Sequence, residues 1–188
     1  MRRWISRIGA VLGIALLGSL GYLGYLRVSG NFHEVSTGQV YRAAQMDGQK
    51  LVRWQRQHGI ASVLNLRGQN DGADWYETEK AVTDRLGITH INFRMSASRE
   101  LTADEARELI RIMRDAPKPL LIHCMAGADR TGLAAALYVA GIDGGSESAA
   151  ERHLSPLYGH IALPAISAAR AMDATWERME PELGFYDS

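Results

Sequence analysis

The stretch Leu120-Leu-Ile-His-Cys-Met-Ala-Gly-Ala-Asp-Arg-Thr-Gly132 decides the fold of this chain. Its apolar beginning predicts a buried strand, its middle contains a glycine typical of a loop, and the alanine-rich sequence that follows predicts a helix. Cys124 and Arg130 enclose five residues at this junction. We expect the rest of the chain to support this loop.

A loop of this length between a strand and a helix can turn its backbone N–H groups inward and form an anion-binding nest at the helix N-terminus. Arg130 offers a planar fork that binds two phosphate oxygens at once. Cys124 would lie beneath the phosphorus, where the N–H groups and the helix dipole lower a thiol pKa from about 8.5 to about 3.5–7.5. The loop is therefore predicted to hold a phosphate above a thiolate.

The C-x5-R spacing, with His before Cys and Thr-Gly after Arg, resembles the signature of the cysteine-dependent phosphatases, the protein tyrosine and dual-specificity superfamily. The ending Ala-Asp-Arg-Thr-Gly looks most like that of bacterial members. The resemblance implies Cys124 as nucleophile, Arg130 as phosphate clamp, His123 as the residue that orders the loop and helps to lower the thiol pKa, and Thr131 as the hydroxyl that eases departure of the cysteine. The predicted phosphate-binding residues are Met125, Ala126, Gly127, Ala128, Asp129 and Arg130.

Composition narrows the function classes further. The chain has 188 residues, and its 21 basic side chains balance 21 acidic ones, which argues against a nucleic-acid binder because no large basic face is implied. Cys124 is the only cysteine, so a disulfide within the chain is excluded. The alternative to a nucleophile is a buried inert thiol. The histidines lack metal-ligand spacing, and we expect no metal and no cofactor.

Residues 1–30 differ in kind from the rest. Residues 8–26 form an uncharged run close to the ~20 residues that span a bilayer, and Arg2, Arg3 and Arg7 precede it. The excess of arginine on that side predicts a single-pass helix in a bacterial inner membrane, with the catalytic domain in the periplasm. The alternative is an exported protein whose signal peptide is cleaved, although such segments usually have an apolar core of about 7–15 residues.

The remaining chain fits one domain of about 150 residues. We expect residues 31–39 to be a polar linker and residues 40–188 to be the phosphatase domain. The segment Val40–Gln45 resembles the start of the domain in dual-specificity-like relatives. Its Tyr41 and Arg42 either reach the site or belong to an edge strand whose arginine pairs with a carboxylate.

Apolar strands at 60–66, 88–93 and 120–124 alternate with helices, which predicts an α/β fold: a central, mainly parallel sheet flanked by helices, with the signature strand central. Capping residues locate the starts of two helices. Asp47 is expected to cap a helix that Gly59 ends, and Thr102 with Glu105 forms a capping box.

The general acid is the main departure from the family pattern. It is usually an aspartate on the loop after the strand at 88–93, and residues 94–100 contain none. Asp129 is the first substitute because its position is fixed relative to the phosphate. The alternative is that Asp129 only braces the loop through hydrogen bonds. Asp71 is the second, and Asp74 and Glu100 are weaker, Glu100 being more typical of a solvated charge.

The resemblance implies a phosphomonoester hydrolase that works through a phosphocysteine. A membrane anchor and an acid loop without aspartate favour a lipid-linked or glycolipid phosphate of the envelope over a phosphotyrosine or phosphoserine protein. A catalytically weak phosphate-binding module is the alternative. A rhodanese-like sulfurtransferase also uses a cysteine in such a loop, but its loop does not require the Arg130-Thr-Gly ending.

Overall fold

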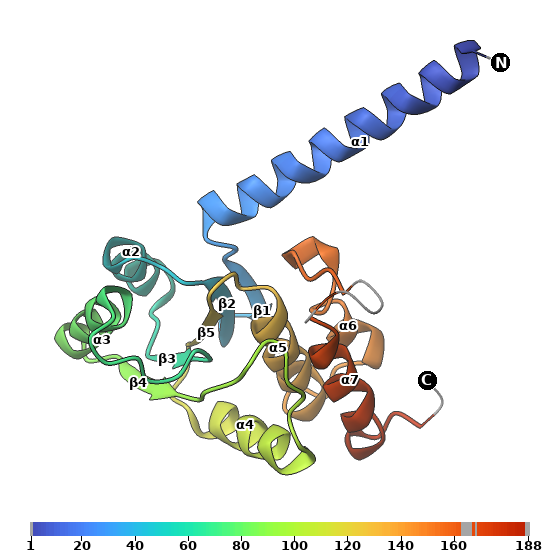
Figure 1. Ribbon diagram of the computed structural model, residues 1–188. Coiled ribbons are helices and arrows are strands. Elements are labelled where there is room, and N and C mark those ends of the chain that lie inside the picture. The colour runs from blue at the N-terminus through green and yellow to red at the C-terminus, as the bar shows by residue number, and fades with distance from the viewer. Residues whose placement is uncertain (1, 163–166, 168, 187–188) are drawn as a thin grey trace.

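The computed structural model describes residues 2–162, 167 and 169–186 (Figure 1). In the first helix, the side chains of residues 2, 3, 5, 6, 8–12 and 15 lie outside this description. Five strands form one sheet in the order β1-β2-β5-β3-β4. Their bounds are β1 His33–Ser36, β2 Val40–Ala44, β3 Ser62–Asn65, β4 Thr89–Asn92 and β5 Leu120–Cys124. The β1–β2 pair is antiparallel, and the other neighbours are parallel.

The register of the parallel strands places the phosphate loop at the carboxyl edge of the sheet. Ala44 at the end of β2 pairs with Cys124, and Asn65 at the end of β3 pairs with His123. All five residues of β5 are buried, because the strand has neighbours on both sides and helices over both faces. In open α/β sheets this carboxyl edge is where ligands bind.

Helices cover both faces of the sheet (Figure 1). One core packs Leu51 of α2 and Val82 of α3 against Leu121, and the larger core packs Leu109 of α4 and Leu137 of α5 against the other face. The bounds are α1 Arg2–Ser29, α2 Gly48–His58, α3 Asp74–Leu86, α4 Ala103–Asp115, α5 Asp129–Gly141, α6 Glu147–Glu151, η1 Pro156–Tyr158, α7 Arg170–Met179 and η2 Pro181–Leu183.

The predicted α/β architecture with β5 in the centre is confirmed, and so are the specific helix ends. Asp47 accepts a hydrogen bond from the Lys50 N–H, and Gly59 ends α2 with a left-handed φ of 66°. Thr102 and Glu105 form the expected capping box. The final helix, expected from about residue 163, begins at Arg170, and residues 163–166 and 168 lie outside the described part of the chain.

The N-terminal side of the sheet differs from expectation in two respects. Residues 33–36, expected within a linker, form β1, a strand whose short polar sequence shows no apolar alternation. The strand β2 is not an edge strand, because β1 covers its outer side. Both differences arise because a tight turn at Gly38, with φ of 66°, folds β1 back onto β2.

Helix α1 projects away from the domain, and only its last turns touch it (Figure 1). Leu26 is 4% exposed, and the Tyr22 hydroxyl donates to the Leu157 carbonyl over 2.6 Å. Among the residues whose side chains the structure describes, no helix is both long enough and apolar enough to cross a membrane. The anchor expected at residues 8–26 is therefore not found there, and residues 8–12 and 15 of that stretch lie outside the description.

Candidate active site

The phosphate loop leaves β5 at Cys124 and enters α5 at Asp129. Its tightest point is Gly127, whose φ is 69° and where a Cβ would lie 2.6 Å from the backbone of Ala43 and Ala44. Only glycine fits there. On the outer side, the Asn31 side-chain amide donates to the Ala126 carbonyl over 3.1 Å. The loop is thus held from β2 and from the end of α1.

Arg42 supports the loop from within the protein. Its buried guanidinium donates to the Gly127 carbonyl over 2.8 Å and to the His153 carbonyl over 3.0 Å, and it lies 4.0 Å from the Tyr158 ring centroid. Burial lowers the pKa of Arg42 to about 10, so the group remains a cation at neutral pH. The sequence suggested a carboxylate partner, whereas the described partners are carbonyls and an imidazole.

The imidazole that Arg42 meets belongs to His153. A guanidinium nitrogen of Arg42 lies 3.0 Å from His153 Nδ1 and donates a hydrogen bond to it. Burial, followed by the charge of Arg42, lowers the pKa of His153 to about 4. His153 is therefore a neutral acceptor at physiological pH. Sequence reasoning found no role for it, because its partner lies 111 residues away.

His123, which the resemblance makes the residue that orders the loop, is fully buried against α3. Its Nε2 lies 3.2 Å from one carboxylate oxygen of Glu79, and the same oxygen lies 2.8 Å from His90 Nε2. The other Glu79 oxygen accepts from the Gln45 side-chain amide over 2.7 Å. Burial raises the pKa of Glu79, but the His123 charge and these hydrogen bonds outweigh burial and hold it well below its ordinary value. A buried carboxylate thus fixes His123.

Two arginines face the site beside Cys124, which is 3% exposed. Arg130 is half-buried and donates to the Met95 carbonyl over 3.3 Å. Arg67 stacks on the Trp75 ring at 3.5 Å, and its pKa is lowered by burial and then by the positive charge of Arg130. Two neighbouring guanidinium groups attract a dianion such as a phosphomonoester. The sequence placed Arg67 at the start of a loop but assigned it no role in the site.

Thr131 lies at the start of α5 and is fully buried. Its hydroxyl has no hydrogen-bond partner among the described residues. A buried hydroxyl without a partner is uncommon, so it is available to a group that the reaction creates. The resemblance assigns this hydroxyl to the departing cysteine, and that role stays a prediction.

Asp129, the first candidate for the general acid, is the first residue of α5 and about one-third exposed. One of its carboxylate oxygens lies 2.8 Å from His160 Nδ1, and the other ring nitrogen of His160 lies 2.9 Å from Asp173 on α7. Burial disfavours the His160 cation, but the hydrogen bonds and charges of the two aspartates outweigh it and raise the pKa of His160. Sequence reasoning had assigned His160 only to a loop.

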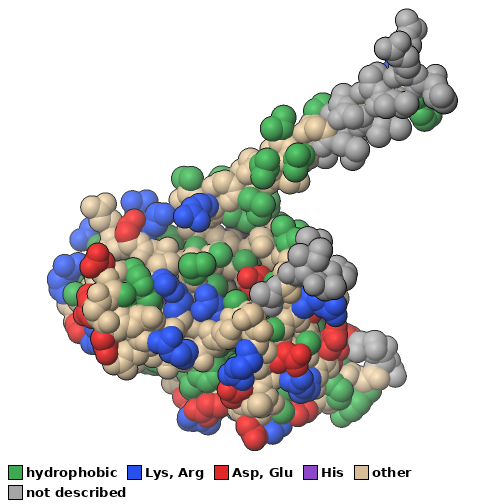
Figure 2. Space-filling model, viewed as in Figure 1, with side chains coloured by type: hydrophobic (Ala, Val, Ile, Leu, Met, Phe, Trp, Pro, Cys, Tyr) green, Lys and Arg blue, Asp and Glu red, His purple; other side chains and the backbone are tan. Residues whose placement is uncertain are grey.

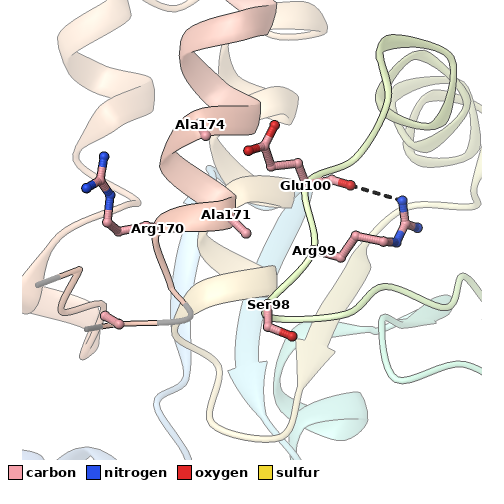
Figure 3. Close-up of a pocket in the computed structure, with 7 residues that line it drawn as sticks. Ser98, Arg99, Glu100, Arg170, Ala171 and Ala174 are labelled. Carbon is pink, nitrogen blue, oxygen red and sulfur yellow. Dashed lines mark hydrogen bonds between the residues drawn. The ribbon is translucent and has the colours of Figure 1, made fainter. Parts of the chain in front are cut away.

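The other acid candidates have different surroundings. Asp71 is exposed, and its carboxylate accepts from the Gln69 side chain over 2.7 Å. Asp74 is exposed in the first turn of α3. Glu100 pairs with Arg178. It lines a pocket between its loop and α7, together with Arg99, as Figure 3 shows. Their roles as alternative acids stay predictions.

A cavity of about 740 Å³ opens beside the phosphate loop, between the loop and the end of α1. Its apolar and aromatic lining faces two arginine side chains, and Figure 2 shows Lys and Arg side chains gathered on the face below the projecting helix. The lining includes Leu23, Leu26, Arg27, Arg67, Trp75, Met125, Ala126, Ala128 and Tyr158.

One carboxylate cluster lies elsewhere in the chain. Glu147 and Glu151 of α6 and Glu180 bring oxygen atoms within 4.8 Å of one another. None of the three belongs to the phosphate loop, and exposed acidic groups often gather without an ion. The cluster adds nothing to the chemistry of Cys124.

Comparisons with known proteins agree with this geometry. The model of the "Tyrosine phosphatase family" matches residues 22–151. No curated protein matches the chain. Among solved structures, TpbA of P. aeruginosa is 22% identical with a TM-score of 0.62, and the match covers 80% of this chain and 85% of that one.

Further solved structures share the fold at lower identity. A complex of a TpbA variant with phosphotyrosine is 21% identical, with a TM-score of 0.56 and coverage of 78% of this chain and 91% of that one. The core catalytic domain of the PP-IP phosphatase Siw14 of S. cerevisiae is 17% identical, with a TM-score of 0.59 and coverage of 82% and 93%.

Proposed function

The chain belongs to the tyrosine phosphatase family and is a cysteine-dependent phosphomonoesterase, and we propose that its substrate is a phosphomonoester of the cell envelope carried by a lipid or glycolipid. The observation that carries the chemistry is the loop between β5 and α5, where Cys124 lies at the base and Arg130 at the rim. A second candidate, phosphotyrosine, is favoured by the phosphotyrosine complex of TpbA.

The reaction proceeds in two displacements at phosphorus. The Cys124 sulfur attacks the phosphorus while the bond to the leaving oxygen breaks, and Asp129 supplies the proton that this oxygen needs. Water then attacks the phosphocysteine, the P–S bond breaks, and the water proton returns to Asp129. Arg130 and the loop N–H groups bind the phosphate oxygens throughout, and Thr131 donates to the departing sulfur.

The cavity beside the loop supports an apolar leaving group. It is continuous with the phosphate loop through Met125 and Ala126, and α1 supplies Leu23 and Leu26 to its wall. Ligand sites of this kind combine an apolar lining with a few polar groups, which here include the arginines Arg27 and Arg67. An acyl chain or isoprenoid attached to a phosphate fits that combination better than a sugar phosphate in solution does.

We further propose that the N-terminal segment keeps the domain on the periplasmic side of the inner membrane. Three arginines precede the apolar run at residues 8–26, and the described side chains Ile14, Leu16 and Leu17 of α1 are more than half exposed. Protease treatment of intact spheroplasts tests this placement. Degradation of the domain in intact spheroplasts supports it, and protection until the membrane is lysed contradicts it.

Phosphate release by the full chain in detergent tests the proposed function. The wild type should hydrolyse p-nitrophenyl phosphate, and Cys124→Ser should lose all turnover while still binding inorganic phosphate as a competitor. Comparison of phosphatidic acid in mixed micelles with a phosphotyrosine peptide then tests the substrate class. Faster turnover of the peptide makes the lipid proposal wrong. Phosphate binding without turnover in the wild type would make the chain a phosphate-binding module.

A further inference from the structure

The buried ring of His160 makes two short contacts, one to each of two aspartates. The ring is 3% exposed, with Asp129 at 2.8 Å on one nitrogen and Asp173 at 2.9 Å on the other. These two aspartates, from α5 and α7, are the charged groups that act on the ring. They come from positions 31 residues before and 13 residues after the histidine, so the contact joins the phosphate loop to the C-terminal helix.

The two hydrogen bonds of this cluster require an additional proton. A neutral imidazole has one N–H and can donate to only one carboxylate, whereas an imidazolium donates to two. Carboxylate oxygens on both ring nitrogens are therefore satisfied only if the ring is a cation or one carboxyl is protonated. In either case the three groups hold one proton more than a neutral histidine between two ionised aspartates.

Asp129 needs such a proton source. It is the first residue of α5, and a carboxylate must receive a proton before it can act as a general acid; His160 lies within hydrogen-bond distance of it. The raised pKa of His160 agrees with a proton retained beside it. The loop after β4, which usually carries the acid in this family, contains no aspartate in this chain.

We infer that His160, held by Asp173, is a positioning residue that orients Asp129 toward the leaving oxygen and stores the proton that Asp129 delivers. This inference rests on the proposed function. As the P–O bond breaks, the proton on His160 Nδ1 moves to Asp129 and from there to the leaving oxygen. As water attacks the phosphocysteine, Asp129 takes a proton from the water and returns it to Nδ1. No other reactant is needed.

The test compares a good leaving group with a poor one. In His160→Gln, which keeps a hydrogen-bond donor but does not titrate, kcat for p-nitrophenyl phosphate should fall only a few-fold. For phenyl phosphate, whose leaving group has a pKa of about 10, kcat should fall by about 10²-fold, the size of a general-acid contribution. The fall of kcat at alkaline pH should also move to lower pH, while KM and inhibition by inorganic phosphate stay unchanged.

Two further variants separate this role from a merely structural one. In an Asp129→Asn background, His160→Gln should cost less than about 2-fold, because residues that act through one another are not additive. Asp173→Asn should give an intermediate, leaving-group-dependent loss, whereas the matched control Glu177→Gln on the exposed side of α7 should have no effect.

Several outcomes overturn the inference. Equal losses on both substrates, additive losses in the Asp129→Asn background, or a loss of inorganic phosphate inhibition would each show that His160 only supports the fold. If the wild type releases phosphate and His160→Gln behaves in one of these ways, the proposed function survives and this inference fails. If the wild type releases none, both fail together.

Discussion

His153 and His160 lie seven residues apart, and both are buried against the phosphate loop, yet they carry opposite electrostatic characters. His153 meets Arg42, and burial with that charge lowers its pKa to about 4. His160 meets Asp129 and Asp173, which raise its pKa in spite of burial. Because burial alone would lower both, the charge of the neighbours decides which histidine is a structural acceptor and which holds a proton.

The largest effect is expected when Arg42 is removed, because the His153 side of the comparison depends on it. Arg42→Met leaves the carbonyls of Gly127, Ala128 and His153 buried without this donor, which should cost about 3 kcal/mol or more of the free energy of unfolding. Urea denaturation measures the loss, with the exposed Arg53→Met as control.

The same variant also breaks the electrostatic comparison. Without the Arg42 charge, the pKa of His153 should rise toward its ordinary value, which histidine NMR titration detects. Unchanged stability together with an unchanged His153 pKa would show that Arg42 does not set the environment of this side of the loop.

The second effect is acid destabilisation through His153. The pKa is about 4 in the folded protein against an ordinary 6.5, so the unfolded chain binds this proton at higher pH. The stability is fully present above about pH 6.5 and is lost as the pH falls toward 4, by about 3 kcal/mol in total. Between pH 4 and 6.5, the free energy of unfolding should change less with pH in His153→Gln than in the wild type. An equal slope in both proteins would assign the acid sensitivity to other groups.

The smallest effect is the opposite pH dependence at His160. Its pKa is raised in the folded protein, so its contribution to stability is complete below the ordinary pKa of 6.5 and is lost as the pH rises through the folded value. The effect is smaller because both aspartate side chains are 30% exposed and water screens their charges. Melting temperatures from pH 6 to 9 should show this loss in the wild type and a smaller loss in Asp173→Asn, where Asp129 alone still contacts the ring.

The parts of the fold that local sequence determines were predictable. The strand at 120–124 and the helix after it follow from apolar patterning, and the ends of α2 and α4 follow from capping chemistry at Asp47, Gly59 and Thr102. Strand β1 was not predictable, because four mostly polar residues show no period and the strand exists only through its pairing with β2.

The candidate site also contains a part that the sequence predicts and a part that it does not. Cys124 and Arg130 are fixed by their spacing within one loop, whereas the residues that support the loop come from distant segments. Glu79 lies 44 residues from His123, and His160 lies 31 residues from Asp129. A single sequence carries no signal for such contacts, because a buried glutamate inside a helix and a lone histidine in a loop look like ordinary surface residues until the fold brings partners to them.

Asn31 bears on where the protein can be trimmed for expression. It adopts φ of 49° just after α1, and its amide donates to the carbonyls of Ala126 and Tyr158. A fragment beginning at residue 31 would keep this side chain but lose Leu23 and Leu26, which line the cavity beside the loop. The safer starting point for a shortened protein is before residue 22, where the family match also begins.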